Sequence, residues 1–203
     1  MVVARTGSLL ALTAVTALSL TGCGSTDTGR IDEHGSSVSA EILTSAPVLT
    51  EYNDADVTFL HLMYPHHAQA VDMARLAPSH TDNRRLLALA MTIEQAQIPE
   101  MQEFTALLQS FGKRAPTTSE GHTDHEAPGM MSTEQMTALR TASGPDFDRK
   151  WLTMMTEHHS GAITMAETEL AKGTNPETQA MARSIIETQQ AEINQMRTML
   201  GQI

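Results

Sequence analysis

Two copies of one motif, M-x-x-H-H-x-x-A-x-x-M-A, lie 92 positions apart in this chain of 203 residues. The first copy comprises Met63, His66, His67, Ala70, Met73 and Ala74, and the second comprises Met155, His158, His159, Ala162, Met165 and Ala166. Adjacent histidines framed by methionines at matched spacings do not recur by accident. The chain therefore consists of two related units, and its fold has to place two equivalent sets of imidazole and thioether groups.

On a helix, each motif forms a single stripe. At about 100° per residue, the stripe from Phe59 to Ala77 is roughly 120° wide, and the one from Trp151 to Ala166 repeats it. Such a stripe faces the neighbouring helices of a bundle. The methionines could simply fill the core and each histidine could be a hydrogen-bonded core residue. Four buried imidazoles, however, each need a partner or a shifted pKa, which favours a ligand or proton-handling role.

The amino terminus resembles that of a bacterial lipoprotein. Arg5 precedes an apolar stretch from Leu9 to Leu20 that is too short to span a bilayer comfortably, and Leu20-Thr21-Gly22-Cys23 has the form of a lipobox. We predict a lipoprotein signal peptide over residues 1–22, lipidation of Cys23, a flexible tether over 23–50 and a folded domain over 51–203. The protein would then be a lipid-anchored, extracytoplasmic membrane protein. Cys23 is the only cysteine, so disulfides and thiolate metal clusters within one chain are excluded.

The domain is predicted to be all-α. Helical apolar spacing runs over about 53–77, where Pro78 should end it, and over about 82–111, 146–172 and 176–200, with Pro65 and Pro99 as expected kinks. Residues 112–145 should form a loop carrying His122 and His125, followed by a short helix that begins at Ser132. The formal net charge of −11 argues against a nucleic-acid partner, which would require a basic face.

The second helix of each unit also contains a repeat. Glu94-x-x-Gln97-Ile98-x-x-Met101 resembles Gln189-x-x-Glu192-Ile193-x-x-Met196, at an offset of 95. A carboxylate or amide that accepts an imidazole N–H fixes the tautomer and orientation of a ligating histidine. The second-shell candidates are Glu94, Gln97, Gln189 and Glu192, although a routine amphipathic helix would also explain the pattern.

Together these motifs resemble the domain of unknown function 305 family over roughly residues 52–200. The resemblance implies a ferritin-like four-helix bundle made of two repeated helical hairpins, in a family of bacterial envelope and secreted proteins of which some are associated with copper. The Gly144-Pro145-Asp146 run also fits that family. The family pattern has Gln before Glu in the second helix, whereas the first unit reads Glu94 before Gln97.

Copper, as Cu(I) or Cu(II), is the metal that the residues favour. Imidazole with thioether is a soft to borderline set, whereas zinc gains little from methionine and a di-iron site would need Glu-x-x-His pairs, which the sequence lacks. Zinc remains possible on the histidines alone. The candidate ligands are Met63, His66, His67, Met73, Met155, His158, His159 and Met165.

The predicted function is copper storage, buffering or transfer at the cell envelope, with a partner protein for metal transfer that the sequence does not identify. A metal-dependent oxidase and an envelope scaffold whose His and Met stripes only pack are the alternatives. The sequence shows no recognisable nucleophile with His and acid, so nothing in it demands catalysis. Whether the two motifs form one shared site or two separate sites is left open by the sequence.

Overall fold

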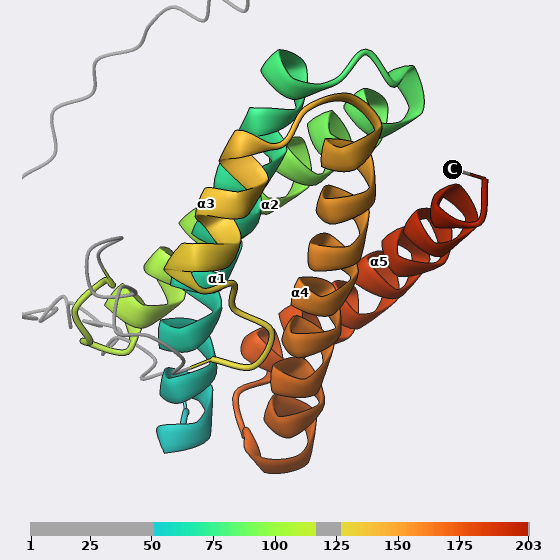
Figure 1. Cartoon of the computed structure of the whole chain (residues 1–203). Helices are drawn as coiled ribbons and strands as arrows, with labels where there is room; N and C mark the ends of the chain where they lie inside the picture. Colours follow the sequence, from blue (N-terminus) through green and yellow to red (C-terminus); the bar gives the residue numbers. More distant parts are fainter. Residues whose placement is uncertain (1–50, 117–126, 203) are drawn as a thin grey trace, which may run out of the picture. The chain divides into compact units, whose positions relative to one another are not determined.

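The computed structural model describes residues 51–116 and 127–202, and within these ranges the regular secondary structure is helical, without a strand. The helices are α1 (Asp54–His80), α2 (Arg84–Ser110), α3 (Thr133–Thr141), α4 (Gly144–Lys172) and α5 (Pro176–Leu200) (Figure 1). The prediction of an all-α fold is confirmed. None of the helices in these ranges has an apolar run long enough to cross a membrane.

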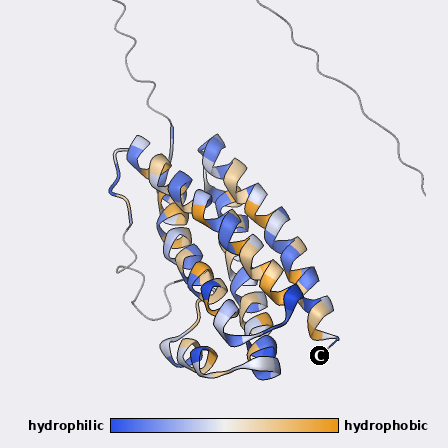
Figure 2. Cartoon of the chain, turned by 90° about the horizontal axis from the view of Figure 1, so that it is seen from above, coloured by the Kyte–Doolittle hydropathy of each residue, from blue (hydrophilic) through white to orange (hydrophobic). Residues whose placement is uncertain are grey.

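The four long helices form two hairpins. α1 packs along α2, α4 packs along α5, and the hairpins meet mainly through α1 and α4, with the short α3 against α1 and α4 (Figure 1). Each long helix carries hydrophilic and hydrophobic positions around its axis (Figure 2). The helices that carry the two histidine motifs are therefore the pair at the centre of the bundle.

Side-chain caps define where the helices begin. Asn53 caps α1 by accepting the backbone N–H groups of Ala55 and Asp56, and Asp56 in turn accepts the N–H of Asn53 at 2.7 Å. The capping box of Ser132 with Gln135 at the start of α3 is as predicted. Such caps satisfy the backbone donors that a helix start leaves free.

The two hairpins clamp each other's turns with equivalent residues. Asp56, near the start of α1, accepts the backbone N–H of Asn175 in the α4–α5 turn at 2.9 Å. Asp148, 92 positions later at the start of α4, accepts the side-chain N–H of Asn83 in the α1–α2 turn at 2.7 Å. Both aspartates are buried. The internal repeat thus extends from the motifs to the contacts that hold the two units together.

The expected end of the first helix at Pro78 is wrong, since α1 continues to His80. A proline removes its own N–H and crowds the carbonyl four residues earlier, but it can occupy a helical backbone. So close to the end of α1, this affects one hydrogen bond, and the N–H of Thr81 closes the last turn on the carbonyl of Ala77 at 3.2 Å.

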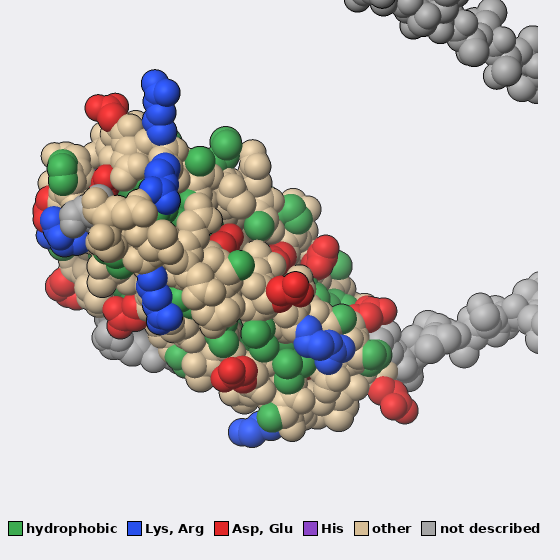
Figure 3. All heavy atoms as spheres, turned by 90° about the vertical axis from the view of Figure 1, so that its right-hand side faces the viewer, with side chains coloured by type: hydrophobic (Ala, Val, Ile, Leu, Met, Phe, Trp, Pro, Cys, Tyr) green, Lys and Arg blue, Asp and Glu red, His purple; other side chains and the backbone are tan. Residues whose placement is uncertain are grey.

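Two apolar clusters fill the bundle, one toward each end. The Trp151 cluster contains, among others, Met73, Leu89, Trp151 and Met155, and the Phe104 cluster contains Phe59, Met63, Phe104 and Met165. Along every long helix, buried or half-buried polar side chains lie between the residues of the two clusters. On the face shown in Figure 3, charged side chains of both signs are scattered and no histidine is visible. The four histidines of the motifs lie between the clusters, inside the bundle.

Candidate metal site

A layer of polar side chains crosses the bundle between the two apolar clusters, and each long helix contributes two of its members. We call it the polar layer: His66, His67, Gln97, Glu100, His158, His159, Gln189 and Glu192. All of these residues except Glu100 are buried, and none of the four histidines is more than 1% exposed. Buried polar groups are costly without partners, so their hydrogen bonds decide what this layer can do.

One histidine of each motif is held by a glutamate from the neighbouring helix of its own hairpin. The Nε2 of His67 lies 2.8 Å from the Oε2 of Glu100, and the Nε2 of His159 lies 2.7 Å from the Oε2 of Glu192. Because a carboxylate only accepts, each imidazole donates from Nε2 and keeps its lone pair on Nδ1. Neither Nδ1 has a hydrogen-bond partner.

The first histidine of the first motif is fixed by the backbone of the segment that precedes α3. The Nε2 of His66 lies 3.0 Å from the carbonyl oxygen of Pro128 and therefore donates to it. The side chain of Gln69, one turn later on α1, holds Met131 by accepting its N–H at 2.7 Å and donating to its carbonyl at 2.9 Å. His66 thus also presents a buried Nδ1 lone pair without a partner.

This segment can cross the bundle only because α4 has a glycine beneath it. A Cβ atom on Gly161 would lie 2.0 Å from the carbonyl oxygen of Pro128, and one on Gly129 would lie 2.8 Å from the backbone oxygen of Glu157. Gly129 also has a φ of 79°, which glycine adopts readily. Gly161 occupies the position in the second unit that Gln69 has in the first. The repeat therefore diverges where the segment crosses.

The two motifs meet through their first histidines. The rings of His66 and His158 lie with centroids 3.7 Å apart at an interplanar angle of 33°, and His158 and His159 have centroids 6.3 Å apart. Neither ring nitrogen of His158 has a hydrogen-bond partner, and the same holds for the Oε1 atoms of Gln97 and Gln189. The two motifs therefore contribute to one common layer, in which several buried lone pairs are available to a ligand.

Burial keeps His66, His67 and His158 neutral. It lowers the pKa of His66 to about 3, with a further contribution from the neighbouring His67. It also lowers the pKa of His67, against the opposing effect of Glu100, and it lowers the pKa of His158 well below the usual range, with repulsion from His66 adding to the effect. A neutral imidazole has the lone pair that a metal requires, so the layer needs little or no deprotonation before it could bind a cation.

The predicted methionine ligands line the apolar clusters on either side of the layer. Met63 and Met165 belong to the Phe104 cluster, Met73 and Met155 belong to the Trp151 cluster, and all four are buried. In the described ranges, no three His, Cys, Asp or Glu side chains are already arranged as a metal-binding group. A metal in the layer would therefore require local adjustment of the side chains.

The predicted role of Glu94 as an imidazole acceptor is wrong. Its carboxylate pairs with Arg75 at 2.7 Å near the surface, and Glu100 holds the histidine instead. The most similar letters of the second helices lie at an offset of 95, whereas the structure keeps the offset of 92 found in the histidine motifs. At that offset Gln97 and Glu100 are equivalent to Gln189 and Glu192. The first unit therefore also has Gln before Glu, as the family pattern does.

Cys23, His122 and His125 lie outside the described residues.

An all-α bundle of two repeated hairpins around a buried histidine layer defines a class of candidate metal-binding bundles. The family model of the domain of unknown function 305 (DUF305) matches residues 56–200, and the chain belongs to this family. The resemblance seen in the motifs is therefore confirmed. No curated protein matches the chain.

Several solved structures are similar over most of the chain. A candidate secreted DUF305 protein from Streptomyces coelicolor is 29% identical, with a TM-score of 0.67 over 73% of this chain and 93% of that one. A DUF305 fragment from Deinococcus radiodurans is 31% identical, with a TM-score of 0.66 over 74% and 98%. CopM in its Cu(II)-bound form is 31% identical, with a TM-score of 0.64 over 72% and 96%, and its Cu(I)-bound and silver-bound forms also match.

Proposed function

We propose that the protein binds copper in the polar layer and stores, buffers or transfers it. The observation that carries the proposal is the set of buried imidazole lone pairs. The Nε2 atoms of His66, His67 and His159 are committed to fixed acceptors while their Nδ1 atoms have no partner, and His158 has neither nitrogen engaged. An acceptor that fixes the N–H of an imidazole orients the other nitrogen toward a metal.

The donor set favours copper over other cations. Neutral imidazoles and the thioethers of Met63, Met73, Met155 and Met165 form a soft to borderline set, which suits Cu(I) and, through the histidines, Cu(II). CopM, of which 96% matches 72% of this chain, has been solved with both copper states and with silver, another soft cation. Zinc could use the histidines but would gain little from the methionines.

Metal titration tests this function. The full chain carrying Cys23→Ser, freed of metal, should take up copper stoichiometrically in competition with a coloured chelator, both as Cu(I) under anaerobic, reducing conditions and as Cu(II). Zinc should be bound more weakly. A scaffold whose stripes only pack would leave all the copper with the chelator, which would contradict the proposal. An oxidase would bind copper and also consume oxygen with a reducing substrate.

We further propose that the protein is a lipoprotein held at the outer face of a membrane through Cys23. Because Leu20-Thr21-Gly22-Cys23 supplies the lipidation signal, Cys23→Ser should move the protein from the membrane fraction to the soluble fraction and abolish labelling with a radioactive or clickable fatty acid. Ser25→Ala, outside the lipobox, should leave both properties unchanged. Fatty-acid labelling that persists in the Cys23→Ser protein would refute the assignment.

A further inference from the structure

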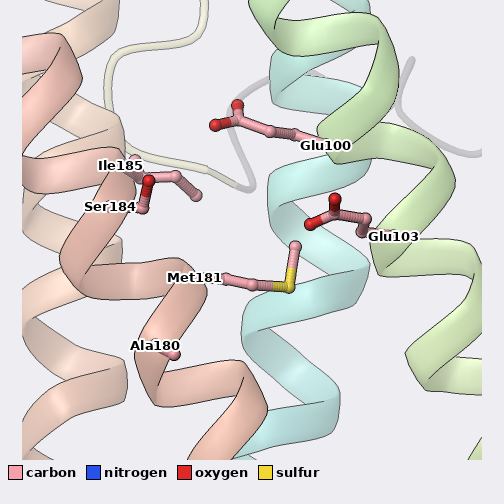
Figure 4. A pocket seen from close by; sticks show the side chains of 6 residues that line it. All are labelled: Glu100, Glu103, Ala180, Met181, Ser184 and Ile185. Carbon is pink, nitrogen blue, oxygen red and sulfur yellow. The ribbon is translucent and has the colours of Figure 1, made fainter. Parts of the chain in front are cut away.

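The polar layer reaches the surface on one side of the bundle, between α2 and α5. A groove of about 250 Å³ opens there, and in the view of Figure 4 side chains from both helices border it. Its lining residues are Glu100 and Glu103 from α2 and Ala180, Met181, Ser184 and Ile185 from α5. The side chain of Met181 extends from α5 toward α2 (Figure 4). The groove therefore offers two carboxylates and one thioether, beside uncharged side chains.

Glu100 connects this groove to the buried histidines. It lines the groove and at the same time accepts the Nε2–H of His67 at 2.8 Å. Its side chain is 22% exposed, whereas that of Glu192, its equivalent in the second unit, is only 9% exposed. The carboxylate that holds His67 thus reaches solvent, whereas the carboxylate of Glu192, which holds the equivalent His159, is nearly buried. The two halves of the layer differ in access, although their internal hydrogen bonds match.

The two units also differ in sequence at the residues that line the groove. At the offset of 92, Met181 is equivalent to Leu89 and Glu103 is equivalent to Gln195. Leu89 is buried in the Trp151 cluster, while Met181 is partly exposed in the groove. Ala180 and Ile185 have the same residue type as their counterparts, Ala88 and Ile93. Compared with the equivalent positions of the other unit, the groove thus has an additional thioether and an additional carboxylate. Both groups can coordinate copper.

We propose that the α2–α5 groove is the port through which copper enters and leaves the polar layer. Glu103 and Met181 receive the ion as transient ligands, and Glu100 releases His67 so that the imidazole can take the ion inward. The transfer is an exchange of ligands in which the oxidation state of copper does not change. Paired carboxylates attract the cation, and an uncharged thioether can release Cu(I) again to a partner or a deeper ligand. This inference rests on the proposed copper binding and adds the route to it.

The test compares the rate of copper exchange with the affinity. In the full chain carrying Cys23→Ser, Met181→Leu with Glu103→Gln installs the residues that the second unit has at the equivalent positions. We expect this variant to exchange Cu(I) with a chelator about tenfold more slowly, which is within the range that local charges and ligands exert on association rates. Its copper stoichiometry and affinity should stay within about twofold of those of the parent chain, because the polar layer is untouched.

The matched control replaces the same residue types elsewhere. Met91→Leu with Glu187→Gln removes an exposed methionine of α2 and an exposed glutamate of α5 outside the groove, and should leave the exchange rate unchanged. An exchange rate in the groove variant equal to that of the parent would overturn the port. A copper affinity that falls in step with the rate would also overturn it, because Met181 and Glu103 would then belong to the binding site itself. Failure of the parent chain to bind copper would instead refute the proposed function.

Discussion

Replacing His66 and His67 by alanine is expected to lower copper affinity about as strongly as replacing His158 and His159. Each double variant should lose at least about 100-fold, since altering even the residues that orient metal ligands costs 10–100-fold. The quadruple variant should lose little more than either double variant. The reason is that the rings of His66 and His158 lie 3.7 Å apart, so both motifs contribute to one layer, and residues that act as a unit are not additive.

The measurement is a chelator competition that gives both affinity and stoichiometry, with far-UV circular dichroism to verify that each variant is folded. His61→Ala, which removes a partly exposed histidine of α1 outside the polar layer, serves as the control and should bind copper like the parent. Glutamine variants at the four positions retain more side-chain volume if alanine destabilises the bundle. Half the stoichiometry in each double variant, with none left in the quadruple variant, would show two independent sites. Unchanged binding in a folded quadruple variant would end the metal hypothesis.

The sequence was sufficient to predict the helices and the burial of the histidines, because both follow from periodicity. The stripe from Phe59 to Ala77 lies on α1 and that from Trp151 to Ala166 lies on α4, each facing the bundle interior. A helix repeats every 3.6 residues, so residues that share a face are recognisable before any tertiary contact is known.

The partner of His67 was missed although a signal for it existed. The most similar letters of the second helices lie at an offset three residues larger than that of the histidine motifs, and this register selects Glu94. Retaining the offset of the histidine motifs would have selected Glu100, because equivalent hairpins pair equivalent residues. The same offset would have shown that Met181 and Glu103 have no chemical equivalent in the other unit. An internal repeat is therefore most informative when a single register is applied to the whole chain.

The contacts of the segment before α3 could not have been predicted in this way. The hydrogen bond from His66 to Pro128 and those between Gln69 and Met131 join residues 62 positions apart. They depend on how an irregular segment crosses two helices, which no periodic pattern records. The close approach at Gly161 likewise becomes recognisable only when the backbone above it is known.

A buried pair of carboxyl groups lies where the start of α1 contacts the α4–α5 turn. The equivalent contact in the other half of the repeat has no such pair. Glu169 of α4 is 1% exposed and faces Asp56, whereas the equivalent residue in the first unit is Ala77. Burial, together with the neighbouring carboxylate of Asp56, raises the pKa of Glu169 to about 8. The carboxylate of Asp56 accepts several backbone N–H groups, which lower its pKa despite its burial. Glu169 is thus protonated in the folded protein near neutral pH and ionised in the unfolded chain.

Glu169→Gln is therefore expected to remove a loss of stability that the parent chain suffers as the pH rises. Between the ordinary glutamate pKa of 4.5 and the folded value of about 8, the folded state binds the extra proton, so the free energy of unfolding falls with rising pH across that window. The difference should reach a few kcal/mol at pH 8.5, since each pKa unit corresponds to about 1.4 kcal/mol. Asp56 does not contribute to this slope, because its lowered pKa confines its effect to more acidic solutions.

Urea unfolding of the parent, Glu169→Gln and Glu167→Gln at pH 5.5 and 8.5 measures this effect. Glu167 is exposed on the same helix, so its variant should follow the parent at both pH values. His66, His67 and His158, whose pKa values burial lowers, bind protons in this window only in the unfolded chain and so make stability rise with pH, but they are common to all three proteins and cancel in the comparison. The expected result is that the free energy of unfolding of Glu169→Gln increases relative to that of the parent between pH 5.5 and 8.5, whereas that of Glu167→Gln does not. An equal change with pH in all three proteins would mean that Glu169 is ionised in the folded bundle, and that Asp56 and the α4–α5 turn tolerate a second charge beside them.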